Sequence, residues 1–285
     1  MSQPFRSTSR RLSGLTLAVT ILTLLLAACG DSAAQPAAVT TVAPTTSSST
    51  EIKVGIIYPN IGSTIVPGQD ALRGMELALA EFGGKIGDKK ITLVKEGTDA
   101  TSTMARTAVR KLVEQDNVDF VIGPLSGDEG LAVRNYARTK PEKVFLNGAS
   151  AAQDATLRDP APNFYRFTTD GVQRMAGLGS YVYQTKNYKK IVTLAEDYSY
   201  PYSQLGGFMT EFCKVGGKVT QKFWVPQGTS DFSAVVSSIP SDIDAIFVVL
   251  AGSSAVNFLK QYDQTGGKAP LIAGSSTVDQ AVLGL

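Results

Sequence analysis

The chain of 285 residues contains no histidine. This absence excludes Ser-His and Cys-His nucleophile pairs and the HExxH zinc site, and it removes the commonest general base at neutral pH. Neither a GxGxxG nor a Walker A motif is present. An enzyme would have to work with Asp, Glu, Lys or Tyr alone, or with a metal held by carboxylates. The adjacent side chains of Glu196 and Asp197 would diverge at a strand end, so we expect no enzyme activity, no cofactor and no metal site.

Cysteine and net charge are also scarce. The two cysteines are Cys29 and Cys213, and Cys213 lies in a helical pattern, where we predict a buried thiol without a disulfide partner. After the first 28 residues, 24 Lys and Arg stand against 25 Asp and Glu, which gives a net charge of −1. No basic block stands out, so nucleic acid is not an expected partner.

The N-terminus carries the marks of an export signal. An apolar run at residues 12–28 follows three arginines, Arg6, Arg10 and Arg11, and it ends in small residues before Cys29. The sequence Leu-Ala-Ala-Cys resembles a bacterial lipoprotein signal. The resemblance implies a signal peptide at residues 1–28, a lipid on Cys29 and a membrane-anchored, extracytoplasmic protein. The alternative is a transmembrane anchor, for which these 17 residues are at the short limit.

Residues 29–50 are mostly Ala, Thr, Ser, Pro and Val, and they hold little that can form a core. We therefore expect a disordered tether behind the lipidated cysteine, with a typical reach of roughly 25 Å. The folded body is expected to begin at residue 51.

From residue 51 onward, strand-like and helix-like segments alternate. The expected strands lie at residues 52–58, 91–94, 118–122, 144–146, 163–168, 191–195, 219–225, 245–250 and 271–273. The expected helices lie at 69–82, 102–113, 172–184, 203–215 and 254–264, with others starting near 128 and at 232–239. This alternation is typical of parallel α/β sheets, and the continuous apolar run at 245–250 suits a strand buried on both faces. The pattern restarts near Asp170, so we predict two lobes, at 51–170 and 171–285.

Several short motifs occur in an order and spacing that resemble one family. They are Gly68-x5-Gly74-x-Glu76-x-Ala78, Asp119-Phe120-Val121-Ile122-Gly123-Pro124, Asp170-x-x-Gln173, Asp197-x-x-Tyr200 and Thr229-x-Asp231-Phe232. Together they resemble the type I periplasmic solute-binding proteins of the branched-chain amino-acid class, which serve ABC importers. The resemblance implies an α/β fold of two Rossmann-like lobes with parallel sheets and a ligand cleft between them. Members usually continue well beyond this length, so we expect an incomplete second lobe and a chain truncated at Leu285.

The first candidate loop of the first lobe holds Ser126 and Gly127. Ligands of open α/β sheets lie at the carboxyl ends of the strands, and this loop follows such an end. A hydroxyl and free N–H groups at the N-terminus of the next helix, which starts near Asp128, suit a carboxylate. The alternative is that Ser126 only caps that helix.

The second candidate loop, at residues 147–152, is rich in small side chains, which let backbone N–H groups approach a ligand. The resemblance implies that Ala149 and Ala151 contact the ligand carboxylate. Ala151 replaces a threonine of the family, and Ser150 beside it supplies a hydroxyl. The resemblance also places an aromatic residue of the family at Pro67, a contact that we expect to be lost or moved.

The second lobe contributes three candidates. The resemblance implies that Asp170 lies close to a ligand ammonium and that Tyr200 closes over the ligand. Asp170 also fits a helix N-cap, and Tyr200 is one of three neighbouring tyrosines, any of which fits a loop-packing role. Ser275 stands where the family has an acidic residue for the ammonium, and Ala251 replaces a tyrosine. A different amino acid, an amide, or a small aromatic or carboxylic acid therefore fits this site equally well.

These expectations describe a lipid-anchored solute receptor. The resemblance implies that a monomer captures an amino acid or a similar small carboxylate by lobe closure and delivers it to an ABC transporter permease. A ligand sensor of the same fold, feeding a membrane receptor instead of a permease, is the alternative that the sequence leaves open.

Overall fold

A computed structural model describes residues 50–278 and 282. These residues belong to one compact unit, Ser48–Leu285. The predicted signal peptide, the lipidation of Cys29 and nearly all of the predicted tether lie outside the described residues. Within the described part of the chain, no helix combines the length and the apolar character that a membrane crossing needs.

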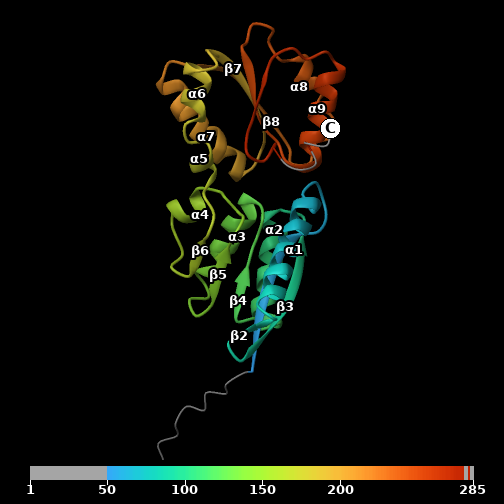
Figure 1. Ribbon diagram of the computed structural model, residues 1–285, viewed down its shortest axis with the longest axis vertical. Helices are drawn as coiled ribbons and strands as arrows, with labels where there is room; N and C mark the ends of the chain where they lie inside the picture. The colour runs from blue at the N-terminus through green and yellow to red at the C-terminus, as the bar shows by residue number, and fades with distance from the viewer. Residues whose placement is uncertain (1–49, 279–281, 283–285) are drawn as a thin grey trace, which may run out of the picture. The chain divides into compact units, whose positions relative to one another are not determined.

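The first lobe is built on a six-stranded sheet in the order β2-β3-β1-β4-β5-β6 (Figure 1). Its strands are β1 Glu51–Pro59, β2 Lys85–Ile86, β3 Lys89–Thr98, β4 Phe120–Ile122, β5 Val144–Asn147 and β6 Phe164–Arg166. All neighbours pair in parallel except β2 with β3. Its helices are α1 Ile65–Glu81, α2 Ser102–Arg110 with the π-turn η1 Lys111–Gln115, α3 Gly127–Ala137 and α4 Asp154–Leu157.

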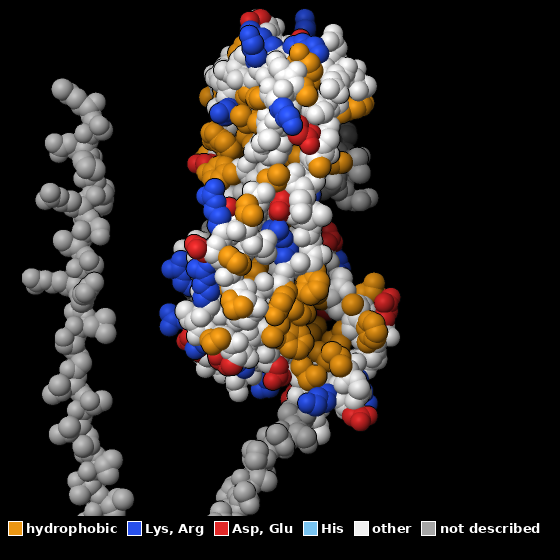
Figure 2. Space-filling model, turned by 90° about the vertical axis from the view of Figure 1, so that its left-hand side faces the viewer, with side chains coloured by type: hydrophobic (Ala, Val, Ile, Leu, Met, Phe, Trp, Pro, Cys, Tyr) orange, Lys and Arg blue, Asp and Glu red, His pale blue; other side chains and the backbone are white. Residues whose placement is uncertain are grey.

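The two faces of this sheet are covered unequally. On one face, Val121 and Phe145 pack with side chains of α2 and α3 in the main core of the lobe. On the other, Val54 and Ile56 pack with Leu72 of α1. The second face continues across the next strands: Phe120 of β4 is paired with Val144 of β5, and Leu146 of β5 is paired with Tyr165 of β6. Val144 and Tyr165 remain 40% and 49% exposed, and Figure 2 shows hydrophobic side chains gathered on the surface of this lobe.

The second lobe is built on a four-stranded parallel sheet in the order β10-β9-β7-β8. Its strands are β7 Lys190–Glu196, β8 Lys218–Val225, β9 Ala245–Val249 and β10 Leu271–Ala273. Its helices are α5 Gly171–Arg174, α6 Leu178–Gln184, α7 Ser199–Lys214, α8 Ser233–Ser237 and α9 Gly252–Gln264. Every residue of β9 is buried, as the apolar run predicted. Phe247 on one face packs with Phe208 of α7, and Ile246 on the other packs in the cluster that contains Phe258 of α9.

Two α/β sheets, parallel except for the β2–β3 pair, confirm the predicted fold class, but two details were wrong. The single helix expected at 172–184 is broken into α5 and α6, because Gly177 adopts a left-handed conformation with φ of 83°. Cys213, expected to be buried, is exposed. Its neighbour Phe212 points into the core of the lobe, and the next residue on a helix is turned by about 100° from that direction.

Candidate functional site

A pocket of about 230 Å³ lies between the two lobes. From the first lobe it is lined by residues after β1, β4 and β5, namely Thr64, Pro67, Leu125, Ser126, Ala149 and Ala151. From the second lobe it is lined by Arg174, Tyr198, Tyr200, Ala251, Gly252, Ser275 and Ser276. Most of these residues follow the carboxyl ends of parallel strands, which is where open α/β sheets bind ligands.

The lobes touch each other around this pocket. Asp128 at the start of α3 accepts a hydrogen bond from the Ser199 N–H at the start of α7 through Oδ1, at 3.0 Å. The Gln153 N–H donates to Ser203 Oγ, also at 3.0 Å. These bonds join residues 71 and 50 positions apart in the chain, and they link the two lobes directly.

The helix-cap alternative for Ser126 is present in the structure. Ser126 lines the pocket, but its Oγ accepts the Glu129 N–H at 3.3 Å and donates to the Ala100 carbonyl at 2.7 Å. Gly127, in contrast, is not among the lining residues. A Cβ added there would lie 2.5 Å from Ser199 Oγ. The absence of a side chain at Gly127 therefore serves the close approach of the two lobes.

The loop after β5 presents two alanines to the pocket and turns its serine away. Ala149 and Ala151 line the pocket. Ser150 is fully buried, and its Oγ packs directly against Gly130 of α3. Asn147 Oδ1 accepts the N–H groups of Ala149 and Ser150 at 3.2 and 2.8 Å, so these two donors are already occupied.

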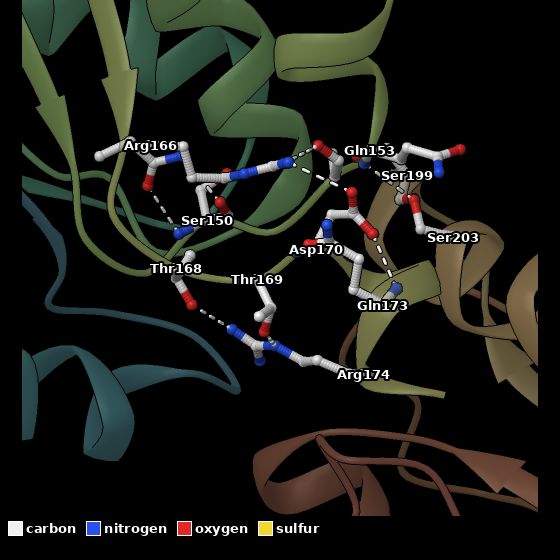
Figure 3. A network of polar contacts seen from close by, with 12 residues as sticks. Ser150, Gln153, Arg166, Thr168, Thr169, Asp170, Gln173, Arg174, Ser199 and Ser203 are labelled. Carbon is white, nitrogen blue, oxygen red and sulfur yellow. Dashed lines mark hydrogen bonds and ion pairs between the residues drawn. The ribbon is translucent and has the colours of Figure 1, made fainter. Parts of the chain in front are cut away.

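Asp170 lies where the chain passes from β6 of the first lobe to α5 of the second, and it does not line the pocket. Its Oδ1 accepts the Gln173 N–H at 2.9 Å, which caps α5, and its Oδ2 forms an ion pair with Arg166 Nη2 at 3.2 Å. Both side chains of the pair are only 9% exposed, and burial lowers the pKa of Arg166. Figure 3 shows Arg166 and Gln173 converging on Asp170. Both carboxylate oxygens are therefore engaged within the protein.

We predict that Asp170→Asn lowers the free energy of unfolding by about 3 kcal/mol, because it leaves the buried Arg166 unpaired while keeping the cap acceptor. Urea unfolding measures this loss. Ligand affinity of the folded variant is expected to stay within about twofold of the parent, because asparagine keeps the cap of α5 and so the place of Arg174. Asp154→Asn is the matched control: its pair with Arg158 is exposed and is worth at most about 1 kcal/mol. A large loss of affinity for Asp170→Asn without a loss of stability would make Asp170 a ligand residue.

Arg174 is the cation of the pocket, and sequence reasoning missed it. It lines the pocket from the end of α5. Its Nη1 donates to Tyr200 Oη and its Nη2 to Thr168 Oγ1, each at 2.8 Å, and Nε donates to Thr169 Oγ1 at 3.3 Å. Figure 3 shows its guanidinium directed at Thr168 and Thr169. Within the described part of the chain it has no acidic partner.

A chain of hydrogen bonds fixes Tyr200 and Ser275 beside Arg174. Tyr200 Oη lies 2.6 Å from Ser275 Oγ. Gln204 Oε1 accepts the Ser275 N–H at 2.8 Å and its Oγ–H at 3.2 Å. Because Ser275 donates to Gln204, the Tyr200 hydroxyl donates to Ser275 and accepts from Arg174. The protons of these hydrogen bonds are thus all assigned, and Tyr200 and Ser275 both line the pocket.

Glu196, at the end of β7, is a buried carboxyl outside the pocket lining. It is 1% exposed, its Oε1 accepts the Gly228 N–H at 3.1 Å, and burial raises its pKa. A raised pKa means that the folded protein favours the protonated form of Glu196. The stability that this gives is fully present below the ordinary pKa of 4.5, and it is lost as the pH rises through the pKa of the folded state.

We therefore expect Glu196→Gln to become more stable relative to the parent as the pH rises from 4.5 to 8, because glutamine keeps the acceptor and does not ionise. Urea unfolding at a series of pH values measures the difference. A difference that stays constant over this range would show that Glu196 does not ionise with a raised pKa.

Among the described residues, no group of three His, Cys, Asp or Glu is placed to hold a metal ion.

Comparison with known proteins identifies the family. A profile of the periplasmic binding protein family matches residues 51–285. A Leu/Ile/Val-binding protein homolog 6 of Brucella melitensis is 24% identical over 225 residues, which cover 76% of this chain and 56% of that protein. The chain thus spans little more than half the length of this relative.

Solved structures show the same fold. A solute-binding protein of an ABC transporter from Rhodopseudomonas palustris, in complex with 3,4-dihydroxybenzoic acid, superposes with a TM-score of 0.75 at 23% identity and covers 82% of this chain and 64% of its own. An ABC transporter substrate-binding protein from Sphaerobacter thermophilus gives a TM-score of 0.70 at 29% identity over 82% of this chain and 65% of its own. This chain belongs to the periplasmic binding protein family, whose members bind solutes and are not enzymes.

Proposed function

We propose that this chain is the extracytoplasmic solute-binding component of an ABC importer. It captures a small organic acid or amino acid in the pocket between its lobes, closes over it and presents the closed form to a membrane permease. The single observation that carries the proposal is the pocket itself, since both lobes line it and bond to each other beside it. The named relatives, a Leu/Ile/Val-binding protein homolog and two ABC transporter binding proteins, support the same role.

Closure supplies the link between binding and transport. The lobes meet through few direct bonds, so a ligand that contacts both lobes shifts the population towards the closed state by its differential affinity. Ser126, Gly127, Ala149, Ser150, Ala151, Asp170, Tyr200 and Ser275 remain the proposed set of cleft residues. We divide it into pocket-lining members (Ser126, Ala149, Ala151, Tyr200 and Ser275) and supporting members.

The N-terminal part of the proposal rests on sequence alone. We infer that residues 1–28 are a signal peptide, that Cys29 carries a lipid and that residues 29–50 tether a monomeric body of two lobes, at 51–170 and 171–285, to the membrane. This arrangement supports delivery to a permease in the same membrane.

Native mass spectrometry tests the proposed function. The protein is incubated with a panel of amino acids and small monocarboxylates at 1:1 to 1:10 ratios, and the bound and released ligands are identified. We expect one ligand per chain, released unchanged, and reduced uptake of that solute in cells that lack the gene. A ligand that is chemically converted, or no binding across the whole panel, would contradict the proposal.

A further inference from the structure

We propose that the cleft selects carboxylates that carry no ammonium group, with Arg174 as the residue that pairs with the ligand carboxylate. This inference rests on the proposed function and names the class of solute. The first step is the charge of the pocket wall. Arg174 is its one charged member among the thirteen described lining residues, none of which is Asp or Glu. A guanidinium without an acidic partner suits a carboxylate, which it binds with two parallel hydrogen bonds.

The second step is that three acids near the pocket, none of which lines it, hold partners within the protein. Asp170 is shared between the cap of α5 and Arg166. Glu129 binds Thr98 Oγ1 and the Ser126 N–H, and Asp128 binds the Ser199 N–H. These bonds direct oxygens of each carboxylate to partners within the protein. An ammonium group buried in this cleft would find no negative charge among the described lining residues, and an uncompensated buried charge costs several kcal/mol.

The third step is that the hydroxyl groups beside Arg174 already take part in hydrogen bonds within the protein. Tyr200 Oη accepts from Arg174 and donates to Ser275, whose hydroxyl donates to Gln204. These hydrogen bonds hold the hydroxyl groups of Tyr200 and Ser275 in place, and Arg174 stands at one end of them as a donor. A ligand ammonium would be repelled by the positive charge of Arg174, whereas a ligand carboxylate would be attracted to it.

The fourth step concerns size and wall chemistry. The pocket of about 230 Å³ is smaller than the usual site for a drug-sized ligand. Pro67, Leu125, Ala149 and Ala151 supply an apolar wall from the first lobe, and Tyr198 and Tyr200 supply aromatic rings from the second. The class of ligand is therefore a compact monocarboxylate with an aromatic or branched apolar body.

Ligand pairs that differ by one ammonium group test the inference. Isothermal titration at pH 7.5 compares leucine with 4-methylpentanoate and phenylalanine with 3-phenylpropanoate on the same full chain. We expect the acid without the ammonium to bind at least about 30-fold more tightly in whichever pair fits the pocket. Equal or tighter binding of the amino acid would overturn the selectivity while leaving the solute-binding function intact. Failure of these four probes and of the wider panel would overturn both.

A variant sharpens the test. Ser275→Glu puts a carboxylate next to Arg174, where it either pairs with a ligand ammonium or neutralises the guanidinium, so the preference for the acid without the ammonium should fall at least about tenfold. Ser237→Glu on the exposed part of α8 is the control for the added charge and should leave the preference unchanged. An unchanged preference in Ser275→Glu, in a protein that still binds, would contradict the assignment of Arg174.

Discussion

Replacing Arg174 with alanine is expected to weaken the binding of a small carboxylate by about 100-fold, which is about 2.8 kcal/mol. The variant removes the one cation among the described residues that line the pocket. Hydrogen bonds between charged partners are roughly twice as strong as neutral ones. It also frees Tyr200 Oη from its donor. Isothermal titration with the carboxylate that the parent binds most tightly measures the change.

Three further variants make the Arg174 result interpretable. Arg106→Ala removes an exposed arginine of α2 and should leave the affinity unchanged. Arg174→Lys keeps the charge but loses the planar fork, so we expect an intermediate loss. Thr168→Val removes one support of the guanidinium and should cost less than the loss of the charge itself. An Arg174→Ala protein that is folded and binds like the parent would contradict this account of the site.

The second large effect is expected for Gly127→Val. A Cβ at this position would lie 2.5 Å from Ser199 Oγ and 2.8 Å from the Tyr200 N atom, both in the other lobe, whereas carbon contacts prefer about 3.5–4.0 Å. The closed state is therefore penalised, and the apparent affinity falls with its population, by at least about 30-fold. Stability without ligand should change by less than about 1 kcal/mol, because the clash is not within the lobe.

The matched control is Gly74→Val on α1, where an added Cβ meets open space. Ligand affinity of the control should equal that of the parent. Titration of the two variants reports ligand affinity, and urea unfolding reports stability. Together they distinguish a variant that cannot close from one whose first lobe is damaged. If Gly127→Val loses stability as well as affinity, or binds as tightly as the parent, the closed contact between α3 and α7 is not the one that ligand binding uses.

The strands were predictable because their signal is local and redundant. Residues 245–250 form a continuous apolar run, and β9 is buried throughout. Helix ends were less predictable. The start of α1 at Ile65 includes Pro67, which a first helical turn tolerates because its N–H would be unbonded there. The break at Gly177 depends on one glycine taking a left-handed conformation, which the apolar pattern on either side does not reveal.

The site was only partly predictable, because sequence shows which side chains follow a strand but not which way they point. Ser150 and Ala151 are neighbours, yet only Ala151 lines the pocket. Asp170-x-x-Gln173 is a capping pattern as well as a family motif, and the pair with Arg166 that occupies the second oxygen shows only in three dimensions. Arg174 follows that motif directly, so the sequence offered it as a charged neighbour of the motif, but only the structure shows that it lines the pocket.

The most direct test of the central claim is a crystal structure with the tightest-binding monocarboxylate. The account predicts the ligand in the pocket between the lobes, with its carboxylate oxygens about 2.7–2.9 Å from the Arg174 guanidinium nitrogens and the Asp128–Ser199 bond in place. A carboxylate bound elsewhere, or bound in this pocket without Arg174, would contradict it.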